Sequence, residues 1–220
     1  MIYVLGWLLE SVENVTDRVS NPFDMRPPCE RYVPGYGDAN ADFHVVGDHP
    51  GTYGGASGEV PFTNDAGLTL QEALAEVDLL DSVGERPETS YTFLSYLHMC
   101  MPDDGEPTEA DYDAMERFFD AEVRAIAAHV LLPVGERATR HVLETYTAQY
   151  GKVPLDMARL HGIEVLGTGW LVYPVRNPAH WEGNDRERLV SALAELQATD
   201  FRREVDLGRF VADDEPYYVR

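Results

Sequence analysis

From residue 43 onward, the sequence alternates short apolar segments with amphipathic helical ones. Strands are predicted at Phe43–Gly47, Tyr91–Leu97 and Val130–Gly135, and on either side of Gly167-Thr168-Gly169 within Ile163–Val175. Strands separated by helices run parallel and need a helical layer on each face of their sheet. We therefore expect an α/β fold, a three-layer α/β/α arrangement around a central, mainly parallel four-stranded sheet. The working site of such a sheet lies at the carboxyl ends of its strands.

Helix start signals stand between these strands. Helices are expected to begin near Thr69, Thr108, Glu136 and Asn184. In three of them an acidic residue three positions after the cap completes a capping box, namely Glu72, Asp111 and Glu187. The third helix is expected to continue to about Tyr150. We find no internal repeat and no low-complexity linker, which favours one domain.

The charge of the chain is strongly acidic. With 17 Lys plus Arg against 39 Asp plus Glu, the formal net charge is −22, and Lys152 is the only lysine. This balance excludes a general basic surface for nucleic acid. Because 44% of the residues are hydrophobic and 10% aromatic, the chain should fold despite its charge. Few lysines and dispersed carboxylates favour a halophilic protein, whose self-repulsion salt screens; an acidic mesophilic protein is the alternative.

Targeting and cysteine patterns indicate a cytoplasmic protein. The first apolar run, Ile2 to Leu9, is too short to span a membrane and lacks the flanks of a signal peptide. The two cysteines, Cys29 and Cys100, are isolated and belong to no CxxC pair, so they are interpreted as reduced thiols. We expect no membrane partner and a monomer.

Two loops at predicted strand ends contain polar residues of the kinds found in catalytic sites. The loop after the first strand begins with Asp48 and His49, is rich in glycine, and places Phe62 beside Thr63-Asn64-Asp65. The loop after the last strand reads Val175-Arg176-Asn177-Pro178-Ala179-His180. An acid, two imidazoles, an amide and a guanidinium should therefore meet at one edge of the sheet.

Five stretches, in order, resemble motifs of the uracil-DNA glycosylase superfamily. Val33-Pro34-Gly35-Tyr36-Gly37 looks like its VPGxG segment, and Val46-Gly47-Asp48-His49-Pro50-Gly51 is similar to its first motif, usually G-E-x-P-G. Gly58, Pro61-Phe62 and Gly67 resemble the following G-x-P-F-x-G-x-x-G. Gly151-Lys152-Val153 and Tyr173-Pro174-Val175-Arg176-Asn177-Pro178-Ala179 resemble its G-K-V and its second motif, usually H-P-S or H-P-A. The resemblance is greatest to the family-4 class and, with the acidic composition, suggests a haloarchaeal member.

The resemblance implies a monofunctional DNA glycosylase that excises a flipped, deaminated base, most simply uracil, in base excision repair. Asp48 would orient water or stabilise the cationic sugar, and Asn177 would donate to the base. Phe62 would stack on the flipped base, with His49, Tyr96 and His180 as further base contacts. The candidates for contacts with the DNA backbone are Gly51, Gly135, Arg137 and Arg176. The family domain would span 31–198, between a helical N-terminal extension, 1–30, packed on it and a C-terminal tail, 199–220.

The sequence departs from family 4 at the cysteines. Members of the family hold an iron–sulfur cluster. The positions of this sequence that correspond to the family's N-terminal CxxC lie near Ser20 to Phe23, and the position of its fourth ligand lies near Met115, so no cysteine stands at either place. Such a cluster needs about four thiolates, and only Cys100 stands at a ligand position. We therefore expect no cluster and no metal. Tyr96 stands where the family has the asparagine that reads uracil, which leaves the excised base open.

Other interpretations remain at this point. Asp48 and Asn177 could serve only as turn residues, and Phe62 and Tyr96 only as core. A superfamily member altered at Tyr96 and Asn177 could bind nucleic acid or a protein partner without excision. A phosphate-binding domain using Gly51 to Gly58 is disfavoured, because the loop lacks a P-loop Lys-Ser/Thr and a GxGxxG helix start.

Overall fold

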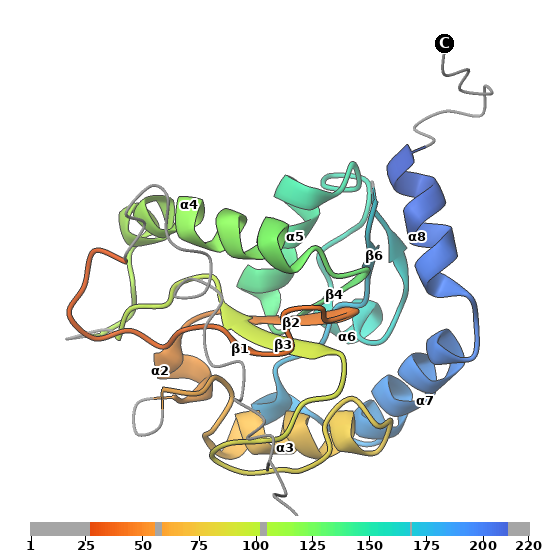
Figure 1. Cartoon of the computed structure of the whole chain (residues 1–220), viewed down its shortest axis with the longest axis horizontal. Helices are drawn as coiled ribbons and strands as arrows, with labels where there is room; N and C mark the ends of the chain where they lie inside the picture. Colours follow the sequence, from red (N-terminus) through yellow and green to blue (C-terminus); the bar gives the residue numbers. More distant parts are fainter. Residues whose placement is uncertain (1–26, 56–58, 102–104, 168, 211–220) are drawn as a thin grey trace, which may run out of the picture.

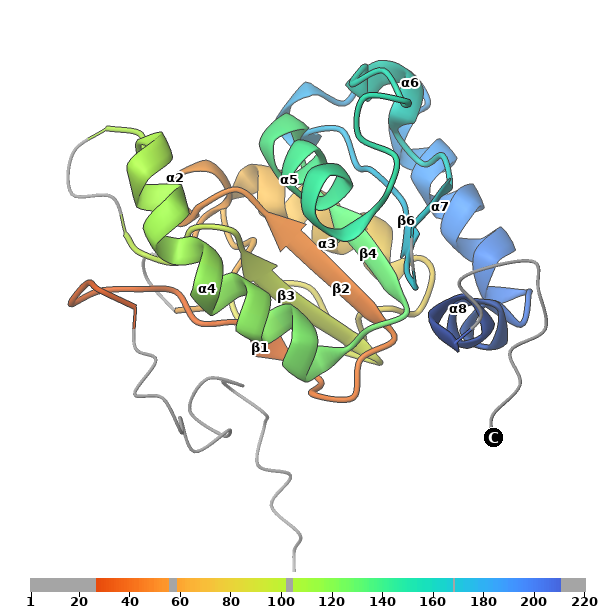
Figure 2. The same cartoon turned by 90° about the horizontal axis from the view of Figure 1, so that it is seen from above.

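The computed structural model describes residues 27–55, 59–101, 105–167 and 169–210. Its centre is a six-stranded sheet in the order β1-β3-β2-β4-β6-β5 (Figure 1). The strands are β1 (Tyr36–Gly37), β2 (Phe43–Gly47), β3 (Thr92–Tyr96), β4 (Val130–Pro133), β5 (Val165–Leu166) and β6 (Leu171–Val172). The four central strands, β3, β2, β4 and β6, run parallel. Figure 2 shows the arrows of β2 and β3 side by side and pointing the same way.

The expected mixed α/β class is confirmed, but a four-stranded sheet is not what the structure has. Two-residue strands are added at both edges, β1 beside β3 and β5 beside β6, and both pair antiparallel. A pair of residues carries too little pattern to be recognised in a sequence, because alternation needs about four or more residues to be seen. The predicted strand at Phe43–Gly47 has the predicted bounds, and all five of its residues are buried.

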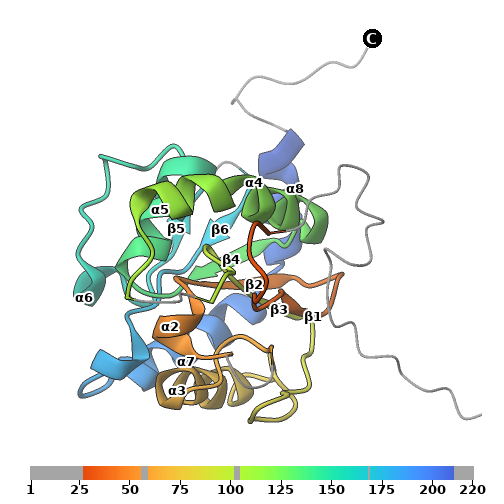
Figure 3. The same ribbon diagram turned by 90° about the vertical axis from the view of Figure 1, so that its left-hand side faces the viewer.

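Helices lie on both faces of the sheet. α4 (Glu109–Ile126) and α5 (Glu136–Tyr146) lie on one face, and α2 (Pro50–Tyr53), α3 (Asp65–Ala75) and α7 (Asp185–Gln197) on the other (Figure 3). Neighbouring residues of β2 show the division, since Val45 packs in the core beneath α3 and α7 whereas Val46 packs against α4 and α5. The short helices α6 (Met157–Leu160) and η1 (Pro178–His180) complete the connections.

The helix starts agree with the predicted caps only in part. Thr108 and Asp111 form the predicted capping box of α4. The helix predicted from Thr69 begins four residues before it, at Asp65, because the Asn64 side chain accepts a hydrogen bond from the Gly67 amide. Asn184 precedes α7 as predicted, but its side chain makes no capping hydrogen bond.

The two ends of the chain differ from expectation where they are described. The predicted helical extension, 1–30, lies almost wholly outside the described residues, and its last four positions form no helix. Within the predicted tail, residues Phe201–Phe210 form helix α8. Phe201 and Val205 are buried in the main core, so this part of the tail is packed structure. No helix in the described part of the chain is both long and apolar enough to cross a membrane.

Cys29 and Cys100 are joined in a disulfide, contrary to the interpretation as separate reduced thiols. A backbone bridge between Tyr32 and Cys100 brings the two segments together although 71 positions separate the cysteines. Sequence spacing could not reveal this pairing because it depends on a long-range contact.

Candidate active site

A cleft of about 820 Å³ opens at the carboxyl ends of the central strands. Six of the predicted site residues line it together: Asp48, Gly135, Arg137, Arg176, Asn177 and His180. They come from the loops after β2 and β4, from the start of α5, and from the segment after β6. The predicted convergence of these loops at one edge of the sheet is therefore what the structure has.

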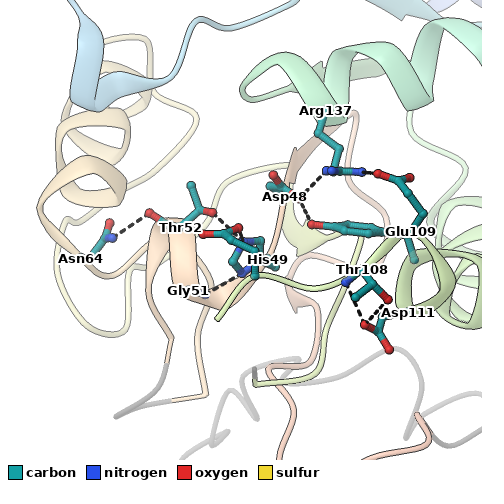
Figure 4. Close-up of polar contacts among 11 residues, drawn as sticks. Asp48, His49, Gly51, Thr52, Asn64, Thr108, Glu109, Asp111 and Arg137 are labelled. Carbon is teal, nitrogen blue, oxygen red and sulfur yellow. Dashed lines mark hydrogen bonds and ion pairs between the residues drawn. The ribbon is translucent and has the colours of Figure 1, made fainter. Parts of the chain in front are cut away.

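Asp48 follows directly after β2 and lies at the base of a polar network (Figure 4). Its Oδ1 accepts a hydrogen bond from the Tyr112 hydroxyl and lies 3.7 Å from Arg137 Nε. The Asp48 side chain is 21% exposed, so solvent still reaches this carboxylate. Arg137 also donates to Glu109 at 2.8 Å, which links α5 to the first turn of α4 beside the acid.

Asn177 is held at the start of the short helix η1. Its Oδ1 accepts from the Ala179 amide at 3.0 Å, and its side-chain NH₂, at a position that lines the cleft, has no hydrogen-bond partner among the described residues. The preceding backbone is fixed as well, because Arg176 donates its amide to His161 and accepts at its carbonyl from Trp181. His180 lines the cleft from the same turn.

Phe62 and Tyr96 are brought together, but below the cleft. They are 1% and 0% exposed, their ring centroids lie 5.3 Å apart, and neither lines the cavity. The Tyr96 hydroxyl donates to the Gly54 carbonyl and accepts from the Phe62 amide, so its polar end is satisfied within the fold. Tyr53 lines the cleft and lies over Phe62, with centroids 5.4 Å apart.

His49 and Gly51 form the start of α2. His49 is 1% exposed, and its Nδ1 accepts from the Gly51 amide while Nε2 lies 2.8 Å from Glu106. Neither residue lines the cleft. As placed, His49 caps a helix and orients the loop that follows Asp48.

The cationic groups of the cleft are engaged with carboxylates. Arg137 pairs with Glu109, Arg140 with Glu136, and Arg176 with Asp185, at 2.6 to 2.9 Å. An anionic ligand entering the cleft must compete with these carboxylates for the arginines, and salt screens both interactions.

Among the lining residues of the cleft that sequence reasoning missed are Tyr53, Glu109 and Tyr112. Glu109 and Tyr112 lie in the first turn of α4, directly after a cap, Thr108, that the sequence does reveal. The cap predicts the helix but not the face it presents, and no local signal pairs Tyr112 with Asp48, 64 positions away.

The cysteine region does not fit an iron–sulfur cluster. The chain has two cysteines, and both are in the disulfide. Met115 is buried in an apolar cluster with Met99, Cys100 and Phe118. Within the described residues, no group of three or more His, Cys, Asp or Glu side chains could hold a metal ion. The four thiolates that such a cluster needs are therefore not available.

Comparison with known proteins gives a consistent result. Residues 34–197 match the model of the uracil DNA glycosylase superfamily. A type-4 uracil-DNA glycosylase of Archaeoglobus fulgidus is 24% identical over 78% of this chain and 83% of its own. A type-5 uracil-DNA glycosylase of Pyrobaculum aerophilum is 28% identical over 76% of this chain and 74% of its own. Since the family model covers well over half of the sequence, the chain belongs to the uracil-DNA glycosylase superfamily.

Proposed function

We propose that the protein is a monofunctional uracil-DNA glycosylase that hydrolyses the N-glycosidic bond of a flipped uracil in base excision repair. The observation that carries this function is the meeting of the Asp48 carboxylate and the Asn177 amide in one cleft at the strand ends. Membership of the superfamily supports the reaction class, and both relatives described above are named uracil-DNA glycosylases.

The two side chains suit the charges that develop in the reaction. Breaking the bond leaves positive charge on the deoxyribose and negative charge on the departing base. Asp48 stabilises the sugar cation and orients the attacking water, and the Asn177 NH₂ donates to the base oxygen. His180, on the same turn as Asn177, is a second donor for the base.

The product is an abasic site. A Schiff-base lyase step needs an amine nucleophile, and the only lysine, Lys152, does not line the cleft. The reaction therefore stops after hydrolysis of the glycosidic bond. The protein acts without an iron–sulfur cluster, since the chain lacks the four thiolates.

The aromatic residues bear on which base is accepted. Tyr53 lines the cleft and contacts Phe62, which does not line it, so a flipped base would contact Tyr53, and direct stacking on Phe62 would need a rearrangement of the site. Tyr96 makes no direct contact with the base in this proposal, because its hydroxyl is already hydrogen-bonded to the Gly54 carbonyl and the Phe62 amide. It acts on base recognition only by positioning those two residues. This arrangement also favours a second candidate function, a member that binds DNA without excision.

We further propose residues 31–198 as the catalytic domain, acting as a monomer in the cytosol of a halophile. The proposed contacts to the DNA backbone are Gly51, Gly135, Arg137 and Arg176. His49 is proposed to hold the loop after β2, which contains Gly51, in place. The net charge of −22 supports the saline cytosol.

A gel assay at high KCl tests the function. Labelled oligonucleotides carry one uracil or one hypoxanthine, single-stranded or duplex, and alkali reveals abasic sites. Cleavage of the uracil strand that is lost in Asp48→Asn supports the proposal. Asp113→Asn is the matched control, because Asp113 also lines the cleft but makes no contact with Asp48. Intact DNA binding with no product at any salt would favour the non-catalytic member.

A further inference from the structure

We propose that Tyr112 is a positioning residue that fixes the Asp48 carboxylate for the reaction, with Arg137 and His98 holding the Tyr112 ring in place. The inference rests on the proposed function, since Asp48 is the acid of that reaction. Neither the sequence motifs nor the roles assigned above include a tyrosine on α4.

Tyr112 reaches the acid because of where α4 begins. The capping box of Thr108 and Asp111 starts the helix at Glu109, which places Tyr112 at the end of its first turn. From there its hydroxyl donates to Asp48 Oδ1. Tyr112 lines the cleft, so the contact is made inside the site.

The Tyr112 ring is packed against two side chains. The Arg137 guanidinium carbon lies 4.2 Å from the ring centroid, and the His98 ring lies 5.5 Å from it. Arg137 is tied in turn to Glu109, at 2.8 Å. The backbone amide of His98 donates to the Asp48 carbonyl at 3.0 Å, so the same segment holds the backbone of the acid. Tyr112 and Asp48 are therefore fixed relative to one another.

The two oxygens of the Asp48 carboxylate differ in their contacts. The Tyr112 hydroxyl and Arg137 Nε both lie against Oδ1. In the part of the chain that the structure describes, no hydrogen bond to Oδ2 is found. A carboxylate with one oxygen anchored cannot rotate freely, so Oδ2 is presented to the water or the sugar in one orientation.

The charged surroundings keep Tyr112 a donor. Burial raises the pKa of Tyr112, and the hydrogen bond to Asp48 raises it further. The other charged or titratable groups around the pair are Arg137, Glu106, His98 and Tyr53. The hydroxyl therefore stays protonated throughout the pH range in which a glycosylase is assayed.

Tyr112→Phe tests the role, because it removes the hydroxyl and leaves the ring against Arg137. Its single-turnover rate of uracil excision should fall by about tenfold or more, with the affinity for uracil-containing DNA unchanged within about twofold. A residue that only packed would change stability and leave the excision rate of the folded enzyme where it was.

Tyr146→Phe is the matched control. The Tyr146 hydroxyl donates to Asp120 Oδ1 at 3.2 Å, so this variant also loses a tyrosine–aspartate hydrogen bond, but outside the cleft. It should keep the wild-type excision rate. A Tyr112→Phe excision rate equal to that of Tyr146→Phe would overturn the inference.

A second measurement separates this inference from the proposed function. The carboxyl ¹³C resonance of Asp48, assigned by its loss in Asp48→Asn, is recorded by NMR at a fixed neutral pH without any substrate. It should move in Tyr112→Phe, which lacks the hydrogen bond to Oδ1, and stay at its wild-type position in Tyr146→Phe. An unmoved resonance in Tyr112→Phe overturns the anchoring whether or not the protein excises uracil. A moved resonance in a protein that excises no base would refute the function and keep the anchoring.

Discussion

Replacing Glu122 with glutamine should remove a pH dependence from the stability of the fold. Glu122 lies on the buried side of α4 and is 1% exposed. The Ser95 hydroxyl and the Gly35 amide are its polar neighbours, but neither carboxyl oxygen has a well-formed hydrogen bond within the described residues. Burial therefore raises the pKa of Glu122 from 4.5 to about 8, opposed only weakly by these two groups.

The sign and size of the effect on stability follow from the difference between the pKa of Glu122 in the folded protein and its pKa in the unfolded chain. The folded protein holds the Glu122 proton more tightly than the unfolded chain, so this stability is complete below pH 4.5 and is lost as the pH rises through about 8. The interval covers about 3.5 pH units, and at 1.36 kcal/mol per unit the loss reaches about 5 kcal/mol. Water drawn in by the ionised carboxylate would reduce the measured loss, but to no less than about 2 kcal/mol.

The assay is denaturant unfolding of wild type and Glu122→Gln at pH values from about 5 to about 9. The wild-type free energy of unfolding should fall relative to that of the variant across this range. Glu187→Gln, at an exposed position of α7, is the control and should parallel wild type. Parallel curves for wild type and Glu122→Gln would refute the argument from burial.

Three further predictions concern the disulfide, the floor of the site and the base contact. Reduction of the Cys29–Cys100 bridge should lower the free energy of unfolding by about 4 kcal/mol, because the cysteines are 71 positions apart; unfolding with and without dithiothreitol measures it, and equal stabilities would contradict it. Gly47→Ala should cost about 1–3 kcal/mol, because a Cβ there would lie 2.7 Å from the Tyr96 ring; an unchanged melting temperature would show that the ring gives way. Asn177→Ala should slow single-turnover uracil excision by about 10- to 100-fold, since a donor to the departing base is lost; an unaltered rate would remove Asn177 from the mechanism.

The central strands could be predicted because a strand buried on both faces is an uninterrupted apolar run. Val130–Pro133 is such a run, Phe43–Gly47 is broken only by His44, and both are wholly buried. The start of α3 could not be placed, because Asn64 and Thr69 are both good caps. Asn64 caps the helix, and its side-chain NH₂ also donates to the Thr52 carbonyl, a tertiary contact that no local pattern contains.

The candidate site was predictable as far as topology determines it. Asp48 and Asn177 follow parallel strands, and the carboxyl ends of such strands meet. What could not be predicted is the set of contacts between elements distant in sequence. Tyr112 beside Asp48 and Cys29 beside Cys100 both depend on how α4 and the loop before it pack. The burial of Phe62 under Tyr53 depends likewise on packing of the loop after β2.

The most direct test of the account is the single-turnover rate of uracil excision at high KCl, compared among wild type, Asp48→Asn and Asp113→Asn. If Asp48 carries the reaction, wild type and Asp113→Asn release uracil at similar rates, and Asp48→Asn is slower by about a hundredfold or more. Equal rates for wild type and Asp48→Asn would contradict the account, because the acid at the end of β2 would then have no part in breaking the glycosidic bond.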